Sequence, residues 1–234
     1  MGISKLIIKR SISLSKTYLF IGAFMVIGVI AISAVSSLSP AVPGGVPGEG
    51  FEDLRILAYF FVPFGAMSAV LISVPVLLLF VYDKNNGLLE YLLSVGKSQR
   101  DVFGSYLKAS LAMAGAILLA AVLGNAAVVA LLGGSALELP VISGVTLVLG
   151  LSAVAFSAVI MMAFSSLQKQ RVGANQPLGI GLGILLIIPT YFLPIFFPAQ
   201  AVTIMLVNAG AAAALAVAMF FLAGRLVKRE KLLP

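Results

Sequence analysis

Long uninterrupted apolar segments are the feature that most constrains what this chain can fold into. A helix needs about 20 apolar residues to cross about 30 Å of hydrocarbon, and six stretches reach that length without an Asp, Glu, Lys or Arg in their middle. They run over 18–38, 56–81, 110–132, 141–165, 177–197 and 201–224. With 61% hydrophobic and 10% charged residues, the chain has too little polar surface for a soluble domain. We therefore expect an all-α, polytopic membrane protein with six transmembrane helices in a single domain over 18–234.

Basic residues are distributed asymmetrically between the segments that join these spans. Fourteen of the fifteen Lys and Arg residues lie on one alternating set, and only Arg55 lies on the other. Cytoplasmic loops carry such an excess, so we expect both termini and the loops 82–109 and 166–176 on the cytoplasmic side of the cell membrane. The formal charge of +7 then faces anionic lipid headgroups rather than nucleic acid, because the basic residues form short clusters between apolar runs.

Residues 1–17, ahead of the first span, are predicted to form an amphipathic helix in the cytoplasmic interface. Apolar side chains recur there at helical spacing among serines and basic residues, as in helices that lie on a membrane surface. The apolar side chains are Ile3, Leu6, Ile7 and Leu14, and their neighbours include Ser4, Lys5, Lys9 and Arg10. Ile8 falls outside this pattern.

Missing residue types exclude several chemistries. The chain has neither cysteine nor histidine, which rules out disulfides, thiolate zinc sites and nucleophiles that depend on a histidine base. No carboxylate lies mid-span, so a proton-coupled pump or an intramembrane protease with paired aspartates is disfavoured. The sequence also lacks the phosphate-binding Gly-x-x-x-x-Gly-Lys-Ser/Thr loop. We expect no enzymatic activity in this chain and no cofactor or metal bound to it.

The predicted fifth span, 177–197, contains prolines near its outer end. Pro189, Pro194 and Pro198 each remove a backbone donor and disfavour helix just before them. Two interpretations stay open: a kinked or partly re-entrant outer end, or a proline-rich helix end followed by a tight turn.

Small and polar residues within the spans have simple explanations. Gly179, Gly181 and Gly183 alternate at a spacing of two, which does not line one helical face as the four-residue packing motif does. We expect these glycines to give flexibility only. Asn125 and Asn208 are the polar residues nearest mid-membrane. Hydrogen bonding between helices is the usual role of such asparagines, and a place in a substrate path is the alternative.

The loop 82–109 carries the most informative pattern, which predicts helix, break, helix. Asn85 or Asn86 can cap the first helix, and Gly96 ends it. Its apolar residues recur on one face and are Leu88, Leu89, Leu92 and Leu93.

Ser98 lies three residues before Asp101 and is expected to cap a second helix that continues into the third span. The first helix is therefore a short amphipathic element between two spans. Such an element either lies on lipid or docks in the groove of a partner, and periodicity does not distinguish the two.

This loop resembles the corresponding loop in permease subunits of type 2 ABC transporters. In that family an acidic-basic pair, Gly-Thr-Leu-Glu, paired leucines, a proline and a Ser-Arg step precede Gly-Lys at the start of the third span. The matching positions are Asp83, Lys84, Gly87, Leu89, Glu90, Leu92, Leu93, Ser98 and, one place late, Arg100. The chain departs from the pattern at Leu88, Gly96 and Ser105-Tyr106, where the family has threonine, proline and Gly-Lys. Six spans, cytoplasmic ends, an amphipathic N-terminus and the proline-rich fifth span extend the similarity over most of the chain.

The resemblance implies the permease half of an ATP-driven exporter, in which the segment 83–95 is a coupling helix that transmits movement of an ATPase subunit to the spans. The implied contacts with that subunit are Asn86, Gly87, Leu88, Leu89, Glu90, Leu92, Leu93, Lys97 and Arg100, with Gln168, Lys169 and Arg171 in the shorter loop. The four leucines would dock, and the charged residues would make polar contacts around them. ATP and Mg²⁺ would bind to the partner ATPase, and two permease halves, identical or related, would associate.

Two other functions stay open. A secondary carrier would use a broken fifth span as its ion or solute site and would transport without an ATPase. A non-transporting assembly or structural protein would use the amphipathic loop to bind lipid or a partner.

Overall fold

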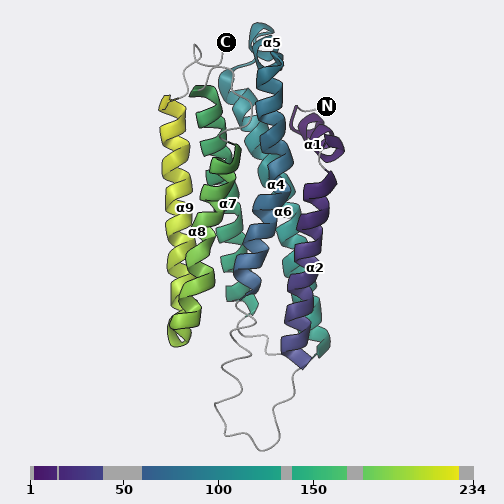
Figure 1. Cartoon of the computed structure of the whole chain (residues 1–234), viewed down its shortest axis with the longest axis vertical. Coiled ribbons are helices and arrows are strands. Elements are labelled where there is room, and N and C mark those ends of the chain that lie inside the picture. Colours follow the sequence, from purple (N-terminus) through teal and green to yellow (C-terminus); the bar gives the residue numbers. More distant parts are fainter. Residues whose placement is uncertain (1–2, 15, 39–59, 133–138, 168–175, 227–234) are drawn as a thin grey trace, which may run out of the picture.

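The computed structural model describes residues 3–14, 16–38, 60–132, 139–167 and 176–226, and these residues form a bundle of helices without a β-strand (Figure 1). The elements are α1 (Ile3–Leu14), α2 (Lys16–Leu38), α4 (Phe61–Asn85), α5 (Leu88–Ser94), α6 (Gln99–Leu132), α7 (Leu139–Leu167), α8 (Gln176–Phe196), the 3₁₀ turn η1 (Pro198–Gln200) and α9 (Ala201–Leu226). The predicted all-α class is confirmed for these ranges.

Five helices are long and apolar enough to cross a bilayer: α4, α6, α7, α8 and α9. The helices α1 and α2 pass the same test only as a pair, bent by 88° between them. The described residues therefore contain five such spans, or six if the bent pair counts as one. In Figure 1 the long helices run side by side, while α1 lies across the end of the bundle where α5 is found.

Helix α4 lies at the centre of the bundle and contacts α1, α2, α5, α6, α7 and α8. Its most apolar window is 78% buried, whereas the corresponding windows of α6, α8 and α9 are 22–28% buried. These outer helices expose large apolar side chains, such as Leu123 of α6 and Phe221 of α9. A water-soluble protein would not leave such an apolar surface uncovered, and a lipid environment accounts for it.

Two apolar clusters hold the bundle together, and α4 contributes to both. One includes Phe61, Val62 and Ala66 near the start of α4. The other includes Leu77 and Phe80 near its end, close to α5. The second cluster joins the spans to the short helices at the α5 end of the molecule.

Close packing of α7 against α8 depends on glycine. A Cβ at Gly179 would lie 2.9 Å from the Cβ of Met161, and a Cβ at Gly183 would overlap the Ser157 hydroxyl. At Gly181 it would meet no atom within 4 Å. The expectation that these glycines give flexibility only was therefore wrong, because Gly179 and Gly183 are four residues apart and form the small-residue contact face of α8.

The prolines of the fifth apolar stretch do not interrupt its helix. Pro189 and Pro194 lie inside α8, which continues to Phe196. Pro198 begins the 3₁₀ turn that leads directly into α9. The described residues therefore show a proline-rich helix that ends in a tight turn and no re-entrant break, while a kink at the prolines stays a prediction.

Candidate functional site

Helix α5 is bounded at both ends by glycines in the left-handed conformation. Gly87 has φ 73° and precedes the helix, and Gly96 has φ 86° and follows it. This region of backbone space costs other residues about 1–2 kcal/mol, so the two glycines allow the chain to turn sharply on either side of α5. As expected, the chain leaves the helical conformation of α5 at Gly96.

The start of α5 differs from the predicted one. Neither Asn85 nor Asn86 caps it, because Asn85 is the last residue of α4 and Asn86 is the C-cap of α4. Gly87 occupies the N-cap position, without a side-chain cap. The predicted segment 83–95 is consequently divided between the last turn of α4 and a seven-residue helix.

The predicted cap of the second helix is confirmed. The Asp101 backbone N–H donates to Ser98 Oγ at 3.1 Å, and the Ser98 hydroxyl donates to Asp101 Oδ2 at 2.6 Å. This side-chain bond to a free backbone N–H stabilises a helix N-terminus by about 1 kcal/mol. It fixes where α6 begins and hence how long the α5–α6 connection is.

The apolar residues of α5 divide between an inner and an outer face. Leu89 and Leu93 are 1% and 6% exposed and pack into the cluster with Phe80 of α4. Leu88 and Leu92, also expected to dock, are half-buried. Since Leu89 and Leu93 face the chain's own interior, they are not available as docking contacts in this arrangement.

The exposed apolar surface at this end comes from side chains that the leucine pattern missed. Tyr82 of α4 and Tyr91 and Val95 in and after α5 are 56%, 63% and 61% exposed. Tyr91 and Val95 are four residues apart and therefore lie one turn apart along the helix. That spacing could have drawn attention to them in the sequence. We call Tyr82, Tyr91 and Val95 the outer face.

The polar residues expected at a partner interface lie close to the outer face in the sequence. Asn86, Lys97 and Arg100 are exposed, and Glu90 is half-buried. The second expected contact loop, with Gln168, Lys169 and Arg171, lies outside the described residues.

A buried ion pair connects α1 to the end of α4. The Arg10 guanidinium donates from both terminal nitrogens to the Asp83 carboxylate, at 2.8 and 3.0 Å. The Tyr106 hydroxyl of α6 donates to Asp83 Oδ2 at 2.5 Å. Asp83 is 1% exposed, whereas the Arg10 side chain is 35% exposed. We call these three residues the Asp83 joint.

The Asp83 joint fixes three helices at one point. A buried carboxylate is costly unless it is paired and hydrogen-bonded, so the contacts from Arg10 and Tyr106 offset the cost of burying Asp83. The neighbouring Lys84 ammonium donates to the Ser165 carbonyl of α7. The last turn of α4, directly before α5, is thus bonded to α1, α6 and α7.

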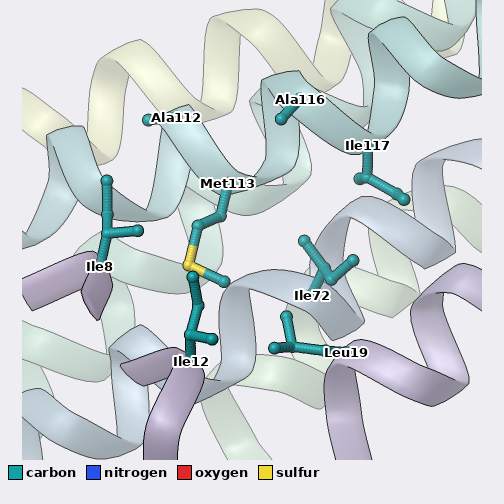
Figure 2. A pocket seen from close by; sticks show the side chains of 8 residues that line it. All are labelled: Ile8, Ile12, Leu19, Ile72, Ala112, Met113, Ala116 and Ile117. Carbon is teal, nitrogen blue, oxygen red and sulfur yellow. The ribbon is translucent and has the colours of Figure 1, made fainter. Parts of the chain in front are cut away.

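An open apolar groove lies in the angle between α1 and α2, with a volume of about 380 Å³. Its lining residues are Ile8, Ile12, Leu19, Ile72, Ala112, Met113, Ala116 and Ile117. Figure 2 shows their side chains converging from α1, α2, α4 and α6, with the Met113 sulfur near Ile12. Ile8, which did not fit the predicted amphipathic pattern, lines this groove. We call this feature the α1–α2 groove.

The two asparagines that were expected near mid-membrane lie on different helices, Asn125 on α6 and Asn208 on α9. The Asn208 side-chain amide of α9 donates to the Leu186 carbonyl at 2.8 Å and to Thr190 Oγ1 at 2.6 Å, both on α8. Asn125 is buried on α6, which packs against α2, α4 and α7. Asn208 therefore makes the helix-to-helix bond that is usual for such residues, and a role of either asparagine in a substrate path stays a prediction.

The described residues contain no group of three His, Cys, Asp or Glu side chains that could hold a metal ion. Comparisons with models of protein families, with curated proteins and with solved structures find no match to this chain. The outer face, the Asp83 joint and the α1–α2 groove are the features of the described residues that bear on function.

Proposed function

We propose that this chain is the membrane-spanning permease subunit of an ATP-driven exporter, similar to those of type 2 ABC transporters. In this view α2 is the first of six spans, both termini are cytoplasmic, and α1 lies in the cytoplasmic interface of the cell membrane. The observation that carries the proposal is α5, a short helix between two spans whose Leu89 and Leu93 are buried while Tyr91 is exposed.

The outer face has the composition of a protein docking surface. Tyr91 and Val95 are exposed at the end of the molecule, beside Lys97 and Arg100 in the sequence. Aromatic residues and arginine are enriched in the centres of protein interfaces. An ATPase subunit that binds this face would make apolar contacts with Tyr91 and Val95 and polar contacts with Lys97 and Arg100.

The inner face of α5 offers a route for transmitting movement. Leu89 and Leu93 pack in the same cluster as Phe80 of α4 and Tyr106 of α6. Packed side chains resist continuous deformation, so a push on α5 would move the adjoining ends of α4 and α6. Switching between inward and outward access would follow from that movement, with ATP and Mg²⁺ bound by the partner and a second permease half completing the pathway.

Truncation of the outer face tests the docking step. We expect the double variant Tyr91→Ala, Val95→Ala to reduce co-purification of an ATP-binding cassette subunit with the tagged chain by at least about tenfold, because loss of a buried aromatic contact costs about 2 kcal/mol or more. Ser94→Ala is the matched control, since Ser94 is exposed on the same helix. Equal retention of the ATPase by the double variant and the control would refute the docking surface.

Transport by the purified chain distinguishes the remaining functions. Reconstituted alone in liposomes, the chain should move no solute, and adding the ATPase with ATP should start transport. Transport driven by an ion gradient without an ATPase would instead establish a secondary carrier, although α8 is a continuous helix and offers no break for its site. Absence of any ATPase among the co-purified proteins would favour an assembly or structural protein.

A further inference from the structure

We infer that the α1–α2 groove is a binding site for one anionic phospholipid of the leaflet that faces the α5 end. The groove would hold part of an acyl chain, and lysines at its rim would bind the phosphate headgroup. The inference depends on the chain lying in a bilayer and is independent of any ATPase partner.

The lining of the groove matches an acyl chain. Every residue that forms it is Ile, Leu, Met or Ala. Ile12, Ala112 and Ala116 are exposed there, so the groove opens outward instead of being filled by the chain itself. A groove of this composition offers no hydrogen-bond partner to water, and water does not stably occupy apolar cavities.

The position of the groove places it at the membrane surface. It lies where α1, which crosses the end of the bundle, meets the start of α2 at 88°. Along α6 the lining residues Met113 and Ala116 follow the polar first turns of the helix and lie in the first turns of its long apolar stretch. This is the depth at which headgroups give way to acyl chains.

Three exposed lysines lie one helical turn from lining residues, each on a different helix. Lys9 precedes Ile12 by three residues on α1, Lys16 precedes Leu19 by three on α2, and Lys108 precedes Ala112 by four on α6. Residues at these spacings share a helix face.

Lys16 and Lys108 lie nearer the α1 and α5 end of the molecule than the lining residues that follow them on α2 and α6. Long helical side chains lean toward the helix N-terminus, and lysine extends its ammonium toward the headgroups. Cations would therefore lie above an apolar groove, which is the arrangement that an anionic phospholipid requires.

Selectivity should come from the headgroup. Acyl chains gain little by leaving one apolar environment for another within a bilayer, whereas each lysine near the membrane surface favours an anionic lipid about fivefold, equivalent to about 1 kcal/mol. Because one phosphate would contact only one or two of the three lysines at a time, we expect a preference of about tenfold for phosphatidylglycerol over phosphatidylcholine.

Quenching of a single tryptophan by brominated lipids tests the site. The chain contains no tryptophan, so Ile12→Trp places one reporter at the groove. In phosphatidylcholine vesicles, brominated phosphatidylglycerol should quench this reporter at about tenfold lower mole fraction than brominated phosphatidylcholine does. Phe24→Trp is the control, because Phe24 is 67% exposed on α2 and lies on the far side of that helix from Leu19. Its quenching should show no such preference.

Two further variants separate the headgroup contact from general effects. Lys108→Gln should reduce the preference to about twofold, whereas Lys97→Gln, which removes the same charge away from the groove, should leave it unchanged. Ala116→Leu should weaken quenching by narrowing the groove. Leu19→Trp is a second reporter if Ile12→Trp does not fold.

Three results would overturn the assignment. Equal quenching by both brominated lipids would exclude selective binding, and equal effects of Lys108→Gln and Lys97→Gln would exclude a specific headgroup contact. Protection of Ile12→Trp from both lipids would mean that another occupant, such as a second copy of the chain, fills the groove.

Discussion

Removal of Arg10 from the Asp83 joint should destabilise the protein more while Asp83 keeps its carboxylate than after Asp83 is replaced by asparagine. Arg10→Met leaves the Asp83 carboxylate buried with only the Tyr106 hydroxyl as a partner. Asp83→Asn instead replaces the charge by a neutral amide of the same shape, which can still accept a hydrogen bond. The pair of changes removes both charges and leaves no buried ion without its counter-ion.

The expected size follows from burial and geometry. Breaking a buried ion pair by removing one partner costs about 3–5 kcal/mol. Because the Arg10 side chain is 35% exposed, water replaces part of its contact, and we expect about 3 kcal/mol for Arg10→Met. In the Asp83→Asn background the same change should cost about 1 kcal/mol or less, which gives a coupling energy of about 2 kcal/mol. Tyr106→Phe, which removes one hydrogen bond to a charged group, should cost about 1.5–3 kcal/mol.

Thermal unfolding of the purified variants in detergent measures these differences. At about 2–4 °C per kcal/mol for a chain of this size, Arg10→Met should lower Tm by about 6–12 °C, and the same change in the Asp83→Asn background by less than about 4 °C. Additivity of the two single changes to within about 0.5 kcal/mol would refute the reasoning, since independent sites add within that margin.

Two pairs of glycine variants test whether the α7–α8 contact and the turn before α5 require glycine. Gly183→Ala should destabilise the protein by about 1–3 kcal/mol, seen as a lower Tm, because the added Cβ overpacks α8 against α7. Gly181→Ala, whose Cβ meets no atom within 4 Å, should be neutral or stabilising. An equal cost of Gly181→Ala and Gly183→Ala would contradict the contact. Gly87→Ala, at φ 73°, should cost about 1–2 kcal/mol and speed hydrogen exchange in α5, whereas Gly104→Ala in mid-helix should not. Unchanged exchange in Gly87→Ala would show that α5 does not depend on that turn.

Local sequence patterns predicted most of the helices and one of their caps. Long apolar runs predicted spans at five places where the structure has long apolar helices. The spacing of Ser98 and Asp101 predicted where α6 begins. The apolar runs and the helix cap both involve residues that are close together in the chain, so each can be recognised without knowing the tertiary structure. The predicted Asn85 or Asn86 cap was wrong because α4 extends to Asn85, and Gly87, in the left-handed conformation, takes the N-cap position of α5.

The features that matter most at the α5 end arise from residues far apart in the sequence. Arg10 and Asp83 are separated by 73 positions, and their pairing depends on how α1 crosses the bundle. The inward rotation of Leu89 and Leu93 depends in the same way on the cluster beneath them. An amphipathic pattern shows which side of a helix is apolar, but not whether its own chain or a partner covers that side.

Docking at the outer face and lipid binding in the α1–α2 groove should influence each other, because the Asp83 joint connects the two regions. In the proposed mechanism, movement of α5 would displace the last turn of α4, and the ion pair between Arg10 and Asp83 would carry α1 with it. Since α1 supplies Ile8 and Ile12 to the groove, a lipid that favours one position of α1 must favour the matching position of α5 by the same free energy. If both proposals hold, replacing phosphatidylglycerol by phosphatidylcholine should change the affinity for the ATPase in the wild-type chain. The change should be smaller in Asp83→Asn, where the connection is weakened. Lipid sensitivity of equal size in both chains, measured by ATPase titration in vesicles, would show that α1 and α5 move independently.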